Sequence, residues 1–270
     1  MNYDFKAYLE EEPIAKMYLQ TAMTWYTIGA NKESRGDMPM SVHDGHRKRL
    51  KQRFAEQGLD MFTDIQVLEM LLFYVIPRQD TNELAHRLLK HFGGFSQVLE
   101  ADIEELVKID GIGENAATFL KLIPAAGRYY QVNRVRMQDQ PLLSIEACGE
   151  YLLPFFSGRC NETVFLLCLD AKRMVIDCRM LGEGSINSAG VPIRKIVEVA
   201  LSMKATSVVL AHNHPSGLAL PSNEDVASTQ RIATALHAVD VILEDHLVFA
   251  DEKDYTSMAQ SGYYRPGMHW

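Results

Sequence analysis

A short apolar segment that leads into a histidine-containing loop and then into a helix constrains this chain most. Residues 206–211 are mainly apolar and rich in β-branched side chains, which is the pattern of a buried strand. His212 and His214 follow at once, in a loop that also contains proline and glycine. Residues 223–240 then repeat apolar side chains at roughly helical spacing. The sequence therefore predicts a strand-loop-helix unit with two imidazoles at its turn.

This unit carries three candidate metal ligands. In an extended backbone alternate side chains share a face, so His212 and His214 can converge on one ion. Asp225 lies in the first turn of the expected helix, within reach of the loop. Two imidazoles and one carboxylate form a donor set that zinc takes in catalytic sites, where a fourth position stays open for water. We therefore predict that these three residues bind Zn²⁺.

The carboxylate also has a purely structural explanation. Ser222-x-x-Asp225 is a helix N-cap pattern, in which the serine hydroxyl accepts from the amide of Asp225. By itself this pair favours a cap, but Ser222 can cap the helix while Asp225 binds metal. The signatures of zinc deaminases and of His-Glu-x-x-His proteases are absent from the sequence.

Composition bounds the class of protein. The 270 residues are 47% hydrophobic and 23% charged, as expected for a soluble globular protein of one or two domains. The net charge of −8 disfavours nucleic-acid binding by the molecule as a whole, so any DNA contact needs a local basic patch. Four cysteines without Cys-x-x-Cys spacing indicate reduced core residues in the cytoplasm. We expect residues 1–42 to be a flexible leader, with neither a signal peptide nor a membrane span.

The N-terminal half is predicted to be helical and to contain two candidate DNA contacts. Residues 43–53 place five cations within seven positions of one helix, which ends at Gly58. Residues 106–117 place a Gly-Ile-Gly turn between two helices and resemble a helix-hairpin-helix, whose free amides can approach a phosphate. Such binding would be independent of base sequence and sensitive to salt. The alternative is a solvated basic face and a bundle with glycine caps, and the acidic residues around the turn oppose phosphate.

Two domains are expected, a helical one over residues 43–131 and an α/β one over residues 141–270. Residues 131–141 are polar and lack a clear period, which marks them as the boundary. The second domain is predicted to contain, in order, a helix (144–156), two strands in a hairpin (163–169 and 173–181), a helix (193–203), the strand-loop-helix unit and a last strand (241–249). This order favours one sheet flanked by helices, an α/β sandwich.

The spacing of the candidate ligands resembles a known signature. His212-x-His214-Pro followed by Ser222-x-x-Asp225 is similar to the JAMM (MPN+) metalloprotease motif. The exact residues of the loop, His-Asn-His-Pro-Ser-Gly, resemble the version of this motif in the RadC family. The resemblance covers residues 43–249 and implies a JAB/MPN-type α/β sandwich. It also implies a zinc hydrolase that cleaves an amide or isopeptide bond in a protein or peptide.

The resemblance implies further roles that the residues alone leave open. It places the general base at Glu162, directly before the first strand, and assigns Ser222 to the oxyanion. From the residues alone, Glu183 and Glu198 are rival bases. Asp245-His246 also resembles the RadC pattern and favours a supporting role beside the ligands.

One position departs from the family pattern, and two other functions stay open. Lys195 stands where RadC-like chains commonly carry an acid, so a role for that acid does not extend to this chain. The chain could instead be a DNA-repair protein that binds DNA through its helical half, with a structural or nucleolytic metal site, or an interaction module with a relic zinc site. The sequence indicates neither the substrate nor the oligomeric state.

Overall fold

The structure is a computed structural model that describes residues 42–77, 79–184, 190–215, 217–251 and 254–266. The expected leader lies outside the described residues except for its last residue. The chain divides into two compact units, residues 1–61 and residues 62–270.

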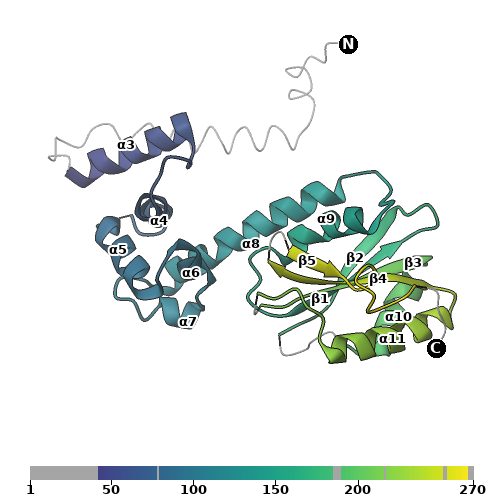
Figure 1. Ribbon diagram of the computed structural model, residues 1–270. Coiled ribbons are helices and arrows are strands. Elements are labelled where there is room, and N and C mark those ends of the chain that lie inside the picture. The colour runs from purple at the N-terminus through teal and green to yellow at the C-terminus, as the bar shows by residue number, and fades with distance from the viewer. Residues whose placement is uncertain (1–41, 78, 185–189, 216, 252–253, 267–270) are drawn as a thin grey trace, which may run out of the picture. The chain divides into compact units, whose positions relative to one another are not determined.

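The described part of the first unit contains helix α3 (Val42–Gln57) (Figure 1). The helix ends where expected, because Gly58 adopts a left-handed φ of 69° that glycine tolerates best. The basic segment 43–53 is therefore helical, as predicted. Leu50 is buried, whereas Lys48 and Arg49 are exposed.

The second unit begins with five helices. They are α4 (Asp64–Phe73), α5 (Thr81–Phe92), α6 (Phe95–Glu100), α7 (Ile103–Leu106) and α8 (Glu114–Arg136). Local capping sets their ends: Thr63 forms a capping box at α4, and Asp80 accepts a hydrogen bond from the amide of Asn82 at α5. Leucines of α4 and α5 pack with alanines of α8 in one hydrophobic core.

The predicted hairpin lies between α7 and α8. Gly111 has a left-handed φ of 95°, and Gly113 is the N-cap of α8 without a side-chain cap. Ile112 between them is buried in the helical core. The turn is thus anchored by its central apolar residue.

Helix α8 continues further than the polar pattern predicted. Its last turns cover residues 131–136, which the sequence assigns to a domain boundary. Val132 and Val135 pack against the core beneath α9 (Ile145–Phe156), so tertiary burial of two valines extends the helix through a polar segment. Only residues 137–144 remain without a helix between α8 and α9.

The rest of the second unit is built around a five-stranded mixed sheet. Its strands are β1 (Thr163–Leu169), β2 (Val175–Glu183), β3 (Ser207–Asn213), β4 (Ile242–Asp251) and β5 (Asp254–Ser257), in the order β2-β1-β3-β4-β5. Only the pair β3 and β4 is parallel, and helix α11 (Asn223–His237) makes the crossover that such a pair needs. The sequence did not predict β5.

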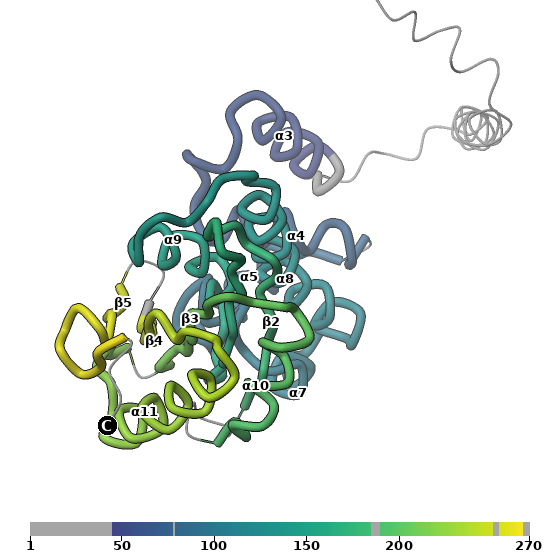
Figure 2. The backbone as a smooth tube through the Cα atoms, turned by 90° about the vertical axis from the view of Figure 1, so that its right-hand side faces the viewer, coloured from purple at the N-terminus to yellow at the C-terminus, as the bar shows by residue number. Residues whose placement is uncertain are grey.

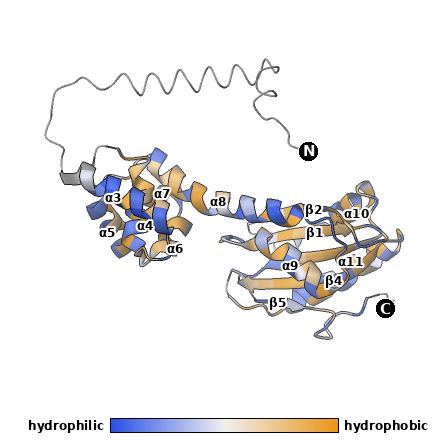
Figure 3. Ribbon diagram, turned by 90° about the horizontal axis from the view of Figure 1, so that it is seen from above, coloured by the Kyte–Doolittle hydropathy of each residue, from blue (hydrophilic) through white to orange (hydrophobic). Residues whose placement is uncertain are grey.

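Helices cover both faces of this sheet, which confirms the predicted α/β sandwich. Helix α9 lies on one face, and α10 (Ile193–Ser202) and α11 lie on the other (Figure 2). The central strands β1 and β3 are buried along their whole length, and Figure 3 shows the apolar character of β1. Among the described residues, no helix is long and apolar enough to cross a membrane.

The alternation of side chains decides which residues face which helices. Val208 and Leu210 of β3 belong to the core beneath α10 and α11, whereas Val209 and Ala211 belong to the core beneath α9. By the same alternation, the next residue of β3, His212, faces α11.

Candidate metal site

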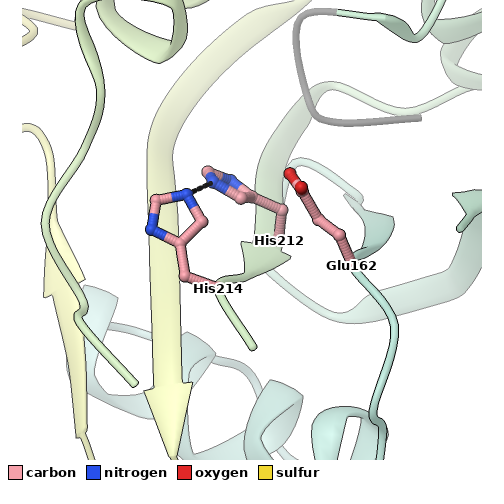
Figure 4. A group of neighbouring side chains, drawn as sticks. All are labelled: Glu162, His212 and His214. Carbon is pink, nitrogen blue, oxygen red and sulfur yellow. Dashed lines mark hydrogen bonds between the residues drawn. The ribbon is translucent and has the colours of Figure 1, made fainter. Parts of the chain in front are cut away.

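The end of β3 brings two histidine rings together. His212 is the last but one residue of the strand, and the amide of His214 still donates to the carbonyl of Phe249 at 2.7 Å. The backbone therefore stays extended through both residues, and their rings share a face, as predicted. Their Nε2 atoms lie 2.9 Å apart (Figure 4).

Asp225 reaches the same point from the first turn of α11. Its Oδ1 lies 3.5 Å from Nε2 of His212, and its Oδ2 lies 3.6 Å from Nε2 of His214. A tetrahedral zinc ion with bonds of ~2.0–2.1 Å would hold its ligand atoms about 3.3 Å apart. Because the three separations scatter around that value, the donor atoms fit such an ion.

The electron pairs of these donors converge. Nδ1 of His214 lies 3.0 Å from the carbonyl oxygen of Leu218, which can only accept, so Nδ1 carries the proton and Nε2 a lone pair. In its protonated form His214 can also donate from Nε2 to Asp225, which raises the pKa of His214, whereas burial lowers the pKa of His212 to about 4. A buried neutral imidazole beside a carboxylate is a suitable ligand set for a cation.

Glu162 is the one of the three candidate bases that lies at this cluster. Its carboxylate is within 4.8 Å of the ligand atoms of both histidines (Figure 4). The rivals are engaged elsewhere: Glu183 pairs with Arg159 at 3.0 Å, and Glu198 pairs with Arg194 at 2.6 Å.

The carboxylates of Asp225 and Glu162 thus both lie close to the rings of His212 and His214. The two carboxylate oxygens of Asp225 lie 3.5 and 3.6 Å from the two Nε2 atoms, and the carboxylate of Glu162 lies within 4.8 Å of the ligand atoms of both rings. Either carboxylate is thus close enough to complete a ligand set, and the resemblance in sequence is what distinguishes Asp225 as the ligand from Glu162 as the base.

Asn213, which sequence reasoning missed, holds the backbone on both sides of Glu162. Its Oδ1 accepts from the amide of Thr163 at 2.8 Å, and its Nδ2 donates to the carbonyl of Asn161 at 3.2 Å. Asn213 is buried, and its neighbours in sequence are the two candidate histidine ligands. Its position between the two histidines was the only feature of the sequence that could have marked Asn213 as part of the site.

Ser222 forms the predicted N-cap of α11. Its hydroxyl accepts from the amide of Asp225 at 3.1 Å and donates to Oδ2 of Asp225 at 2.6 Å. The backbone amide of Ser222 also donates to Oδ2, at 2.8 Å, which completes the capping box. In this arrangement the hydroxyl proton points to Asp225, so an oxyanion role requires the hydroxyl to rotate.

A second row of polar groups lies behind His212. Nδ1 of His212 is 2.8 Å from Nε2 of His246, and Nδ1 of His246 is 2.6 Å from Oγ1 of Thr229. All three side chains are buried, and burial lowers the pKa of His246 well below its ordinary value. Thr229 was not identified from the sequence, although it lies one helical turn after Asp225.

Asp245 and Lys195 have structural contacts. Asp245 accepts from the backbone amides of His246 at 2.7 Å and Ala259 at 2.9 Å and from the hydroxyl of Ser257, so it binds these groups rather than the imidazole beside it in sequence. Burial raises the pKa of Asp245. Lys195 donates to the carbonyl of Leu181 at 2.5 Å and so ties α10 to β2.

Comparison with known families matches both halves of the chain. Residues 142–263 match the RadC-like JAB domain, and residues 45–118 match the UPF0758 N-terminal domain. The chain belongs to the UPF0758 family of RadC-like proteins. This membership confirms the resemblance and the JAB/MPN type of fold.

Three relatives show how much of the chain this likeness covers. A UPF0758 protein of Ruegeria pomeroyi is 36% identical over 226 residues, which are 84% of this chain and 100% of that protein. A UPF0758 protein of Rhodobacter capsulatus is 35% identical over 212 residues, 78% of this chain and 98% of that protein. One of Fusobacterium nucleatum is 31% identical over 227 residues, 82% of this chain and 97% of that protein.

Proposed function

We propose that this chain is a zinc-dependent hydrolase that cleaves an amide or isopeptide bond in a protein or peptide. His212, His214 and Asp225 would hold the ion, and Glu162 would act as general base. The observation that carries the proposal is the convergence of two imidazole Nε2 atoms, 2.9 Å apart, on one carboxylate, with a second carboxylate beside them. The choice of an amide bond rests on membership of the JAB class.

Each residue has a distinct task in this scheme. A bound zinc ion supplies a Lewis acid and lowers the pKa of a coordinated water to about 7. Glu162 takes the proton from the attacking water and passes it to the departing amine, which is general acid–base catalysis by one carboxylate. Ser222, after rotation of its hydroxyl, would donate to the developing oxyanion.

Metal content is the direct test of the proposed site. We expect near-stoichiometric zinc in purified wild-type protein and its loss in His214→Ala. Glu162→Gln should keep the ion and lose peptide-bond cleavage. Wild-type protein that binds no zinc, even after zinc is added back, would refute the proposal. Cleavage by Glu162→Gln at the wild-type rate would refute the assignment of the base alone.

A second candidate function, DNA binding, is favoured by one observation. Lys48 and Arg49 are exposed on α3, within the basic segment 43–53. In the hairpin segment 106–117 the fully exposed Asp110 weakens the case for phosphate contact. The case for a DNA contact is therefore stronger at α3 than at the hairpin.

The proposed cytoplasmic location is supported by four free cysteines, of which only Cys160 is exposed.

A further inference from the structure

The second ring nitrogen of His212 has an unusual partner for a metal ligand. Metal-bound histidines usually donate their other ring N–H to a carbonyl or carboxylate, which fixes the tautomer. His214 follows this rule through the carbonyl of Leu218. His212 instead contacts Nε2 of His246, at 2.8 Å. Because an imidazole nitrogen can donate or accept, His246 alone does not determine which nitrogen of His212 carries the proton.

Thr229 removes this ambiguity. Its Oγ1 lies 2.6 Å from the backbone carbonyl of Asp225 and 2.6 Å from Nδ1 of His246. A carbonyl oxygen only accepts, so the single hydroxyl proton of Thr229 is directed to Asp225. The hydroxyl oxygen must then accept from His246. The sulfur of Met258, 3.7 Å from Oγ1, is too weak an acceptor to compete.

The protons further along the chain follow from this one. In the neutral ring of His246, a proton on Nδ1 leaves a lone pair at Nε2, which lies 2.8 Å from Nδ1 of His212. That lone pair accepts the Nδ1 proton of His212. The lone pair at Nε2 of His212 is then directed at His214 and Asp225, as binding of an ion requires.

We propose that Thr229 and His246 form a tautomer relay, which holds His212 in the Nδ1–H form that binds metal through Nε2. The relay rests on the proposed zinc site and adds two positioning residues to it. It starts at the backbone of Asp225 and ends at His212, so it joins one ligand on α11 to another on β3 through a residue of β4. The two ligands are thereby oriented together, although they come from different elements of the fold.

Replacing Thr229 with valine tests the relay with little change in side-chain volume. Without the hydroxyl, Nδ1 of His246 loses its acceptor, and the ring can move its proton to Nε2. His212 would then accept at Nδ1 and carry its own proton on Nε2, where the ion should bind. Loss of such outer partners typically costs 10–100-fold in metal affinity, so we expect zinc affinity to fall by roughly that factor in Thr229→Val. Thr229→Ser keeps the hydroxyl and should stay within a few-fold of wild type.

The experiment uses full-length wild type, Thr229→Val and Thr229→Ser. Zinc affinity is measured by competition with a chelator of known affinity, and folding is monitored by circular dichroism of the metal-free proteins. In the metal-free state, two-bond ¹H–¹⁵N correlations of labelled histidines report the tautomer. Wild type and Thr229→Ser should show Nδ1–H for both His212 and His246, and Thr229→Val should lose this pattern.

A second matched pair covers the case in which Thr229→Val does not fold. His246→Gln can place its amide oxygen where Nε2 lies and accept from His212, whereas His246→Leu cannot. We expect zinc to bind more tightly to the glutamine variant than to the leucine variant.

The outcomes separate the relay from the proposed function. If wild type binds zinc and Thr229→Val binds it equally well, the relay is wrong while the zinc site stands. An Nε2–H tautomer at His212 in the metal-free wild type also overturns the relay. A wild type without zinc affinity overturns the proposed function, and the relay with it.

Discussion

Asn213 offers a test of how the proposed base is held, and the size of the effect can be worked out from its contacts. Asn213→Ala removes a hydrogen bond at 2.8 Å to the amide of Thr163 and one at 3.2 Å to the carbonyl of Asn161. Each neutral bond contributes about 1 kcal/mol, and a buried group left without a partner costs about 1–3 kcal/mol. We therefore expect the free energy of unfolding to fall by about 2–4 kcal/mol.

The loss should be visible in melting temperature and in local exchange. For a unit of this size, 1 kcal/mol corresponds to roughly 2–4 °C, so the melting temperature should fall by roughly 4–16 °C. The amide of Thr163, which is buried, should also lose protection from hydrogen exchange. Once a substrate is known, kcat should fall about 100-fold, because a misplacement of 1 Å at the reacting groups can have that effect.

A matched variant separates the two contacts. Asn213→Asp keeps the acceptor for the amide of Thr163 but places a carboxylate oxygen against the carbonyl of Asn161. We expect Thr163 to stay protected in this variant while stability still falls, because two acceptors face each other. Protection and stability at wild-type levels in Asn213→Ala would refute the argument that Asn213 positions Glu162.

Three further predictions follow from the site and from α3. In zinc at 100-fold excess over its Kd, the free energy of unfolding of the wild type should rise by about 2.7 kcal/mol, and Asp225→Asn should show a smaller rise in the same urea titrations. A wild-type stability that does not respond to zinc would contradict this. Ser222→Ala should lower the stability of the metal-free protein by about 1 kcal/mol through loss of the N-cap, whereas Ser222→Thr should keep most of it; equal urea midpoints for all three proteins would argue against the cap. If α3 binds DNA, Lys48→Ala/Arg49→Ala should weaken salt-sensitive binding in an electrophoretic shift assay while Asp225→Asn does not, and unchanged binding by the double variant would exclude this surface.

Several features of the site were predictable from local sequence. The two rings of His212 and His214 share a face because alternate residues of any extended segment do so. The N-cap at Ser222 and the position of Asp225 in the first turn follow from the spacing within one helix. These relations connect residues a few positions apart, and backbone geometry sets them.

The choice of Glu162 over its rivals depends on the tertiary structure. From the residues alone, Glu162, Glu183 and Glu198 are equivalent carboxylates. The antiparallel register that pairs Val164 with His212 brings the residues before β1 to the end of β3. Nothing in the local sequence around Glu162 encodes that pairing.

Neither the relay nor the last turns of α8 were visible from sequence. Thr229, His246 and His212 lie on α11, β4 and β3, so their hydrogen bonds exist only after the parallel pair and its crossover helix have formed. Residues 131–136 likewise become helical because two valines find a core beneath α9, against their polar surroundings. The sequence by itself determined the cap and the alternation that brings the two candidate histidine ligands together, because these depend on backbone geometry over a few residues. Only the tertiary structure decided which of the three candidate carboxylates lies beside the histidine pair, and which side chains contact Asn213 and His246, because these contacts join segments distant in the chain.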